Sequence, residues 1–384
     1  MDKAEVLRLF QQVVQKPRNT YLDGWISGGG KVCGYYCTLI PGEILTAAGM
    51  VPYRIRGAGS DDTGLADVHM SSNVCTFVRH TVNLALEGQF DFLSGVVCMN
   101  GCDQARRAHD VLKQKSKIPF HAFLSVPRAA EERLFSWYKE ELENLIAAME
   151  KDFQVKIGPD ELREAIGLHN AVRTKLIELN ELRRGSNPPL SGSEALTVTV
   201  AAHLMPLKDF DELAGELLDA TAGGEEPRNY RARFIVTGGE LDEPEFLKAI
   251  EEQGGLVVYE DTCFGARFYE ELVAEDGDPL DKIAERYFYR VPCARMFNSF
   301  SPRYANIERI KQAYKADGLI AQRMKQCVIN AGHLYNFIRR GRENGLPTLV
   351  LDREYLAGGY GQVKTRVQAF IENIESKSKK GAVR

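Results

Sequence analysis

Short apolar runs alternate with amphipathic stretches along most of the chain. Apolar runs of strand length between helical patterns are typical of a parallel β-sheet with helices on both faces. We therefore expect an α/β fold with two parallel-sheet domains, one in each half of the chain. The predicted strands are residues 31–36, 52–55, 95–99, 120–126, 232–237, 256–260, 318–325 and 348–351.

Three long helical patterns occupy the middle of the chain, at residues 129–151, 159–184 and 193–204. A polar stretch with Gly and Pro, residues 222–228, precedes the first strand of the second half. This order predicts an N-terminal α/β domain (1–127), a helical insert and linker (128–227) and a C-terminal α/β domain (228–384). We expect the two sheet domains to face each other across a cleft.

Composition and charge narrow the classes of function. The chain has 384 residues and a formal net charge of −4, so it lacks the basic surface typical of nucleic-acid binding. No apolar run is long enough to cross a membrane, and the charges scattered through the first residues do not resemble a signal peptide. We therefore expect a cytoplasmic protein without nucleic-acid or membrane partners, in which cysteines stay reduced.

The eight cysteines are distributed unevenly over the predicted elements. Ligands of parallel α/β sheets bind beyond the carboxyl ends of the strands, and half of the cysteines lie within three residues after a predicted strand: Cys37, Cys102, Cys263 and Cys327. Cys75, near the start of a predicted helix at 71–87, and Cys293, in a loop, can reach the same cleft. The remaining two lie inside strands, as expected of small buried residues: Cys33 and Cys98.

Several thiolates in one cleft indicate a metal site. All-thiolate ligand sets select zinc or iron–sulfur clusters, and structural zinc usually takes closely spaced cysteine pairs. The pairs Cys33/Cys37 and Cys98/Cys102 fit zinc poorly, because the first member of each lies within a strand. Dispersed thiolates suit an iron–sulfur cluster better, while a zinc-stabilised α/β binding protein remains the alternative.

Ordered motifs then connect the chain to a known family. They are GYYC (34–37) leading to residues 41–44 and 47–52, then 72–79, NGCD (100–103), EDTCFGAR (260–267), 283–287 with 292–293, 317–320 with 325–327, and 361–370. On these motifs the chain resembles, over nearly its whole length, the family that unites 2-hydroxyacyl-CoA dehydratases with ATP-dependent benzoyl-CoA reductases.

The resemblance implies a cluster-bearing subunit. Such subunits have two flavodoxin-like, Rossmann-like parallel-sheet domains with a helical part between them, and the positions here that match their [4Fe–4S] ligands are Cys75, Cys102 and Cys327. The implied partners are a larger sister subunit, an acyl-CoA substrate and an ATP-hydrolysing activator. The chain has no G-x4-GK[ST] phosphate loop of its own, so we expect no ATP site in it.

A third relative, the double-cubane cluster protein, uses six cysteines. This chain has cysteines at the three further matching positions, which are Cys37, Cys263 and Cys293. The resemblance therefore also implies a second cubane, giving a double-cubane [8Fe–9S] cluster.

The segment 100–110 is most similar to the aromatic-reductase branch of the family. We therefore expect an iron–sulfur subunit of a benzoyl-CoA-type reductase, which passes low-potential electrons to the thioester-activated ring. One alternative is a 2-hydroxyacyl-CoA dehydratase subunit, in which one electron starts a ketyl-radical elimination of water. Another is a double-cubane protein that reduces small molecules or transfers electrons.

A few further side chains are candidates for the chemistry. Weak candidates for a proton donor near the cleft are Tyr36, Glu43 and His109. Packing, a helix-dipole contact and solvation, respectively, are the more common roles of such residues. Coenzyme A carries phosphates, which guanidinium groups bind in a fork geometry. The candidates for that contact are Arg79, Arg106 and Arg366.

Overall fold

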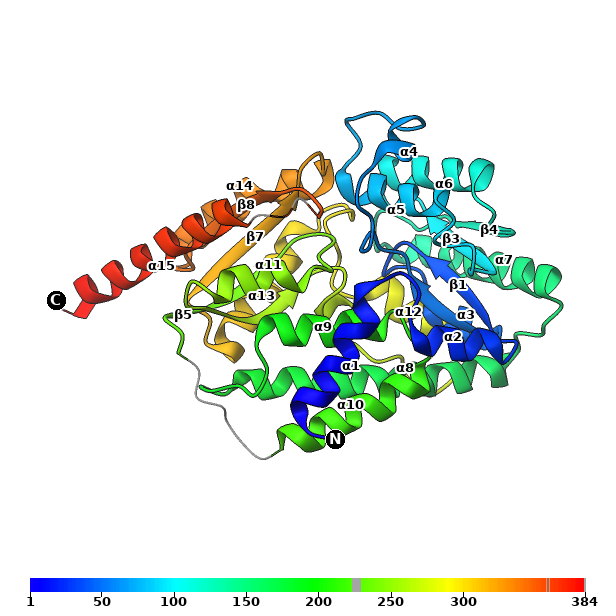
Figure 1. Ribbon diagram of the computed structural model, residues 1–384, viewed down its shortest axis with the longest axis horizontal. Helices are drawn as coiled ribbons and strands as arrows, with labels where there is room; N and C mark the ends of the chain where they lie inside the picture. Colours follow the sequence, from blue (N-terminus) through cyan, green and yellow to red (C-terminus); the bar gives the residue numbers. More distant parts are fainter. Residues whose placement is uncertain (223–228, 357, 359, 383–384) are drawn as a thin grey trace.

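The protein is described by a computed structural model covering residues 1–222, 229–356, 358 and 360–382, with the backbone alone for 378–382. The strands are β1 (Lys31–Tyr35), β2 (Met50–Arg54), β3 (Gly95–Met99), β4 (Phe120–Leu124), β5 (Ala232–Thr237), β6 (Gly255–Asp261), β7 (Gly318–Met324) and β8 (Thr348–Arg353). They form two four-stranded parallel sheets, in the orders β2-β1-β3-β4 and β6-β5-β7-β8 (Figure 1).

Helices cover both sheets and connect their strands. Those of the first half are α1 (Lys3–Gln15), α2 (Thr20–Ser27), α3 (Gly42–Ala47), α4 (Gly64–Asp67), α5 (Thr76–Leu86) and α6 (Asp103–Lys115). The middle of the chain contains η1 (Glu132–Leu134), α7 (Phe135–Phe153), α8 (Pro159–Glu181), η2 (Leu182–Arg184), α9 (Gly192–Ala202) and α10 (Leu207–Thr221). The second half adds α11 (Pro244–Glu251), η3 (Ala266–Phe268), α12 (Pro279–Tyr289), α13 (Phe300–Tyr314), α14 (Val328–Glu343) and α15 (Gly361–Ala382).

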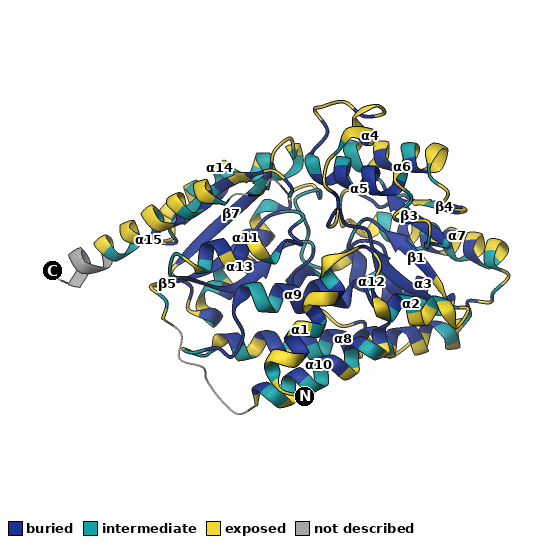
Figure 2. Cartoon of the chain, viewed as in Figure 1, coloured by how far each residue is buried: buried dark blue, intermediate teal, exposed yellow. Residues whose placement is uncertain are grey.

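The predicted fold class is confirmed by the two parallel sheets with flanking helices. The inner strands β1, β3 and β5 are almost entirely buried, whereas the edge strands β4 and β8 are partly exposed (Figure 2). All five residues of β3 are buried, and the limits of β3 and β5 are those predicted from the sequence. The strand β2 begins at Met50, two residues before its prediction. Pro52 has no backbone N–H to donate. The strand tolerates it because β2 lies at the edge of the sheet and pairs with a neighbour on one side only.

The middle helices do not form a separate layer between the sheets. Helix α7 packs on β4 of the first sheet, whereas α9 packs on β6 and α11 of the second. Helix α12, from the second half, returns to pack on α7 and α8 and completes the core beneath the first sheet. Of the predicted linker at 222–228, only Ala222 lies within the described residues.

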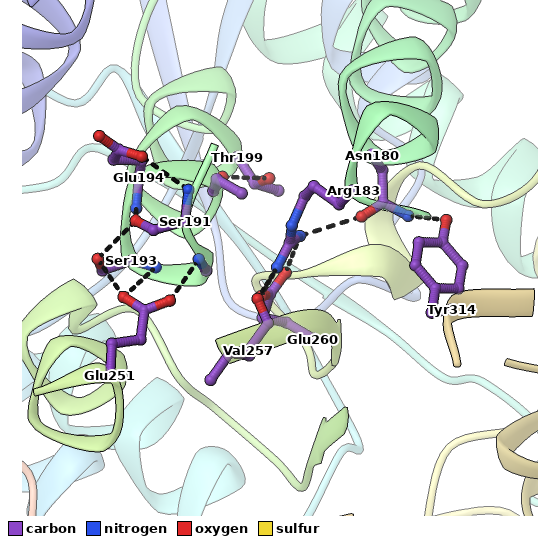
Figure 3. Close-up of polar contacts among 12 residues, drawn as sticks. Asn180, Arg183, Ser191, Ser193, Glu194, Thr199, Glu251, Val257, Glu260 and Tyr314 are labelled. Atoms are coloured by element: carbon purple, nitrogen blue, oxygen red, sulfur yellow. Dashed lines mark hydrogen bonds and ion pairs between the residues drawn. The ribbon is translucent and has the colours of Figure 1, made fainter. Parts of the chain in front are cut away.

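Polar contacts fix the middle helices to the second sheet (Figure 3). Ser191 caps α9, and the Glu251 carboxylate accepts hydrogen bonds from the backbone N–H groups of Gly192 and Ser193. The buried Arg183 guanidinium of η2 donates to Glu260 of β6, at 2.5 and 2.8 Å, and to the carbonyl of Val257. No helix in the described part of the chain is long and apolar enough to span a membrane.

Buried ion pairs join the two halves. Arg56, just after β2, donates from Nε to the Asp242 carboxylate at 2.8 Å, and Asp242 follows β5 of the other sheet. The Tyr355 hydroxyl donates to the same carboxylate at 2.6 Å and accepts from the backbone N–H of Gly57. These contacts hold the carboxyl ends of both sheets against each other.

Candidate active site

The carboxyl ends of the two sheets open into one cavity of about 440 Å³, a size typical of small-molecule sites. Its walls come from the residues after β1, β3, β5, β6 and β7 and from the amino ends of α5, α6 and α14. All six predicted ligand cysteines line it: Cys37, Cys75, Cys102, Cys263, Cys293 and Cys327. The other two, Cys33 and Cys98, are buried inside β1 and β3.

Three of the cavity cysteines occupy the same backbone position. Cys75, Cys102 and Cys327 are the N-cap residues of α5, α6 and α14, and we call them the helix-cap triad. The Ala105 N–H donates to the Cys102 sulfur at 3.3 Å, and the Asn330 side-chain amide donates to the Cys327 sulfur at 3.4 Å. Free N–H groups and the helix dipole stabilise a thiolate at this position.

The helix α5, which carries Cys75 as its N-cap residue, is shorter than predicted. Helix α5 starts at Thr76, five residues after the predicted start at residue 71, because residues 72–74 form a turn. Cys75 therefore lies directly at the N-terminus of the helix and faces the cavity.

The other three cavity cysteines lie in loops, and we call them the loop triad. Cys37 follows β1, Cys263 follows β6, and Cys293 lies between α12 and α13. Buried guanidinium groups surround this triad: Arg267 Nη1 lies 3.9 Å from the Cys263 sulfur, and the charge of Arg54 acts on Cys37 and Cys263. Positive charge is therefore concentrated beside these three sulfurs.

In the metal-free chain, burial outweighs these contacts and raises the pKa of four cavity thiols, those of Cys37, Cys75, Cys102 and Cys263. It raises the pKa of Cys75 to about 12, with further increases from the neighbouring Cys102 and Cys327. Burial likewise raises the pKa of Cys37, Cys102 and Cys263, although Arg54 opposes it at Cys37. A bound metal displaces the thiol protons, so metal binding here would release protons and become stronger as the pH rises.

The donor set fits an iron–sulfur cluster. Six soft sulfur donors converge on one cavity, and thiolate ligation is what such clusters require. Among the described residues, no three His, Cys, Asp or Glu side chains are close enough to hold one metal ion. A cluster distributes its ligands over several irons, so its thiols lie farther apart than the ligands of a single ion.

The predicted proton donors do not share one environment. Tyr36 lines the cavity, but its hydroxyl donates to Thr81 at 2.9 Å, and burial raises the pKa of Tyr36 far above its usual value. His109 lies on α6, where its ring packs against His121 and Phe123 and burial lowers its pKa. Of these two side chains, only that of Tyr36 lines the cavity.

Glu43 is a buried partner in an ion pair, an environment that favours a structural carboxylate over a proton donor. Its buried carboxylate accepts from Arg173 at 2.6 Å and from the Tyr287 hydroxyl at 2.9 Å. Burial alone would raise the pKa of Glu43, but the charges of Arg173, His169 and Arg286 together outweigh it and hold the pKa well below its usual range. The group is therefore ionised at neutral pH and has no proton to give.

The structure does not bring the three predicted coenzyme A arginines together. Arg79 pairs with Asp67 at 2.8 Å, Arg106 is exposed on α6, and Arg366 of α15 lines a separate hollow beside Asp317. The arginines that do line the cavity are Arg128, Arg267 and Arg295. Of these, Arg128 is exposed and is the one placed to meet a ligand from solvent.

Sequence reasoning also missed Glu240 and Arg54. Glu240 lines the cavity and accepts from Arg54 Nη2 at 3.1 and 3.2 Å, and burial raises its pKa. Its position three residues after β5 is the same signal that identified the cysteines, so it could have been found. Arg54 lies within an edge strand, where no pattern distinguishes it.

Comparison with known proteins identifies the family of the chain. A family model described as 2-hydroxyglutaryl-CoA dehydratase, D-component, matches residues 37–374. The (R)-phenyllactyl-CoA dehydratase beta subunit of Clostridium sporogenes is 25% identical over 371 residues, covering 95% of this chain and 97% of that protein. The putative dehydratase subunit YjiM of Escherichia coli is 28% identical over 358 residues, covering 90% and 92%.

Similarity extends to aromatic reductases. A benzoyl-CoA reductase subunit of Thauera aromatica is 26% identical over 266 residues, covering 67% of this chain and 68% of that protein. These relatives are named as subunits, so the family consists of components of multi-subunit enzymes. Because the family model matches most of its length, the chain belongs to the 2-hydroxyglutaryl-CoA dehydratase D-component family.

Proposed function

We propose that this chain is the iron–sulfur subunit of a reductase in this family and that its six cavity cysteines hold a double-cubane [8Fe–9S] cluster. The helix-cap triad would hold one cubane and the loop triad the other. The observation that carries the proposal is the convergence of six thiols from both halves on one cavity. When bound, such a cluster takes up and releases electrons at low potential.

The chain's own residues supply a dry and rigid setting for that chemistry. Phe77, Val78, Met99 and Met324 are buried apolar side chains of the cavity wall and exclude water. The interhalf pairs of Arg54 with Glu240 and Arg56 with Asp242 fix the two walls relative to each other. Burial and hydrogen bonds to sulfur are the means by which a protein tunes a cluster.

For the substrate we propose an aromatic acyl-CoA. The names of two relatives include an aromatic acyl thioester, benzoyl-CoA and phenyllactyl-CoA. Arg128 is exposed at the cavity and suits a coenzyme A phosphate. The proposed partners are a larger sister subunit and an ATP-hydrolysing activator that supplies the electrons.

A 2-hydroxyacyl-CoA dehydratase subunit is the second candidate. The dehydratase relatives named above align with 90–95% of the chain, whereas the benzoyl-CoA reductase relative aligns with 67%. The two reactions differ in electron balance. Ring reduction adds two electrons and two protons to the substrate, whereas elimination of water consumes no net electrons.

The test combines the full chain with its sister subunit and activator under anaerobic conditions. Benzoyl-CoA and phenyllactyl-CoA are supplied in turn with ATP and a measured amount of a one-electron reductant. The proposal expects a ring-reduced thioester and two electrons consumed per product, whereas an unsaturated acyl-CoA without net electron consumption would establish the dehydratase. Reduction of small molecules without turnover of either thioester would contradict an acyl-CoA substrate.

Two variants show whether the activity depends on the thiol site. Cys102→Ser removes a ligand of the helix-cap triad and should abolish turnover. Cys98→Ala changes a cysteine inside β3 and should retain it. Full activity in Cys102→Ser would overturn the proposed site.

A further inference from the structure

Arg54 is a buried cation beside the loop triad that has no role yet. It is the last residue of β2, its side chain is fully buried, and it pairs with Glu240 across the two halves. A guanidinium group removed from water is costly unless its donors are satisfied. The hydrogen-bond partners of each guanidinium N–H group therefore indicate which contacts Arg54 makes and which of its donors are left over.

The pairing with Glu240 leaves part of the guanidinium unused. Nη2 donates to both Glu240 oxygens, at 3.1 and 3.2 Å. Nε and Nη1 are buried and have no hydrogen-bond partner among the described residues. The neighbouring Arg267 differs, because it binds both Asp261 oxygens and the carbonyls of Gly238 and Asp261.

Two aromatic rings hold the Arg54 guanidinium in place. Its central carbon lies 4.7 Å from the centre of the Phe264 ring and 5.5 Å from that of Tyr35. Phe264 directly follows Cys263 in sequence, and Tyr35 comes two residues before Cys37. After Glu240, the groups on which the Arg54 charge acts most strongly are the Cys37 thiol, the Tyr35 hydroxyl and the Cys263 thiol.

We propose that Arg54 sets the reduction potential at the loop triad, by placing its charge and its free N–H groups against the Cys37 and Cys263 sulfurs once these ligate metal. Each electron that enters the site adds negative charge, and hydrogen bonds to the sulfurs stabilise that charge. Arg54 therefore raises the potential and favours electron uptake on this side of the cavity. The inference rests on the proposed iron–sulfur function and deepens it.

The test uses the full chain, purified anaerobically with its metal, as wild type and as Arg54→Gln and Arg54→Lys. Iron per chain is measured first. Ti(III) citrate then reduces the protein in a mediated potentiometric titration, in which each Ti(III) gives one electron and becomes Ti(IV), and electron paramagnetic resonance follows the signal. We expect the midpoint potential to fall in Arg54→Gln and to stay closer to that of wild type in Arg54→Lys, which keeps the charge.

Two further variants separate tuning from folding. Arg183→Gln removes an equally buried arginine from its carboxylate partner, Glu260, outside the cavity lining, and should leave the potential unchanged. Glu240→Gln removes the anion that partly neutralises Arg54 and should shift the potential upward, so it also tests the proposal if Arg54→Gln fails to fold. An unchanged midpoint potential in iron-replete Arg54→Gln, or in Glu240→Gln, overturns the proposed role of Arg54. It leaves the proposed iron–sulfur function standing. A wild-type protein without iron would overturn the proposed function itself.

Discussion

At the residue scale, backbone position separates the eight chemically identical cysteines. Six line the cavity, whereas Cys33 and Cys98 are enclosed within strands. Replacing Cys37 by Ser should remove the cubane of the loop triad, so that iron falls by about half in a six-thiolate, two-cubane site. Iron analysis of the anaerobically purified variant measures this.

Cys98→Ala is the matched control for that variant. It should keep full iron and lower the free energy of unfolding by roughly 1 kcal/mol, because only a small buried group is lost. An unchanged iron content in Cys37→Ser would rule out the second cubane and leave a single cluster. Iron loss in Cys98→Ala would show that the division by position is wrong.

The free energy of unfolding depends on pH through the buried His169 side chain. It is buried between α8 and α3, where its Nε2 bonds to the Thr46 hydroxyl at 3.0 Å, and burial lowers its pKa to about 4. Between pH 6.5 and 4 the unfolded chain binds a proton at this histidine and the folded chain does not, so acid destabilises the fold. The shift corresponds to about 3 kcal/mol over that window.

A His169→Gln variant measures this contribution, because glutamine keeps a polar group near Thr46 but does not titrate. Its unfolding free energy, from urea titrations at pH 7, 5.5 and 4, should fall less steeply with acid than that of wild type. His203 and His333 also have lowered pKa values and act in both proteins, so the difference between the two curves isolates His169. Parallel curves would show that the pKa of His169 is the same in the folded and unfolded states, which would contradict this account.

The role of a residue can be predicted from the sequence where it depends on neighbouring residues in the chain. It cannot be predicted where it depends on a partner far away in the chain. The ends of predicted strands pointed to four of the six cavity cysteines, because parallel strands bring their carboxyl ends to one edge of a sheet. Glu43 could not be assigned, since its partner Arg173 lies 130 residues away in the chain. The pair of Arg54 with Glu240 is hidden in the same way, because 186 residues separate the two in the chain.

At the element scale, close approach of a helix to a sheet depends on one glycine. A Cβ atom on Gly192, at the start of α9, would lie 2.5 Å from the Val257 side chain and 2.8 Å from its carbonyl on β6. Gly192→Ala should therefore push α9 off the second sheet and cost roughly 1–3 kcal/mol, as overpacking does. Thermal and urea unfolding measure the loss.

Gly167→Ala provides the control in a helix without such contact. Nothing lies within 4 Å of a Cβ at Gly167 in α8, so alanine should be neutral or stabilise the protein by up to about 1 kcal/mol through its helix propensity. Equal stability of the two variants would contradict the close packing of α9 on β6.

Local sequence patterns predicted where helices and strands begin and end. They did not predict which helices and sheets pack against each other. The strand β3 and the start of α8 at Pro159 agree with the predictions, because apolar runs and Pro-Asp starts are local signals. The return of α12 onto α7 and α8 has no local signal. It depends on which apolar faces meet in the folded chain.

At the scale of the whole molecule, buried charges help to join the two halves that enclose the cavity. Asp242 is fully buried and accepts from Arg56 and Tyr355. Asp242→Asn would leave the Arg56 cation buried without its counter-charge, at a cost of roughly 3–5 kcal/mol. Urea unfolding should show this loss, together with weaker retention of iron.

Asp160→Asn is the surface counterpart, since the pair of Asp160 with Arg163 is exposed and pairs of that kind contribute little. Its stability and iron content should match those of wild type. If Asp242→Asn behaved like Asp160→Asn, the two halves would not depend on this pair.

The most direct test of the account is the iron and acid-labile sulfide content of the full chain, purified without oxygen. Six thiolates that hold two cubanes predict about eight iron and about nine sulfide per chain, in a brown protein that oxygen bleaches. About four iron would support a single cubane instead. Zinc without iron or sulfide would contradict the account altogether.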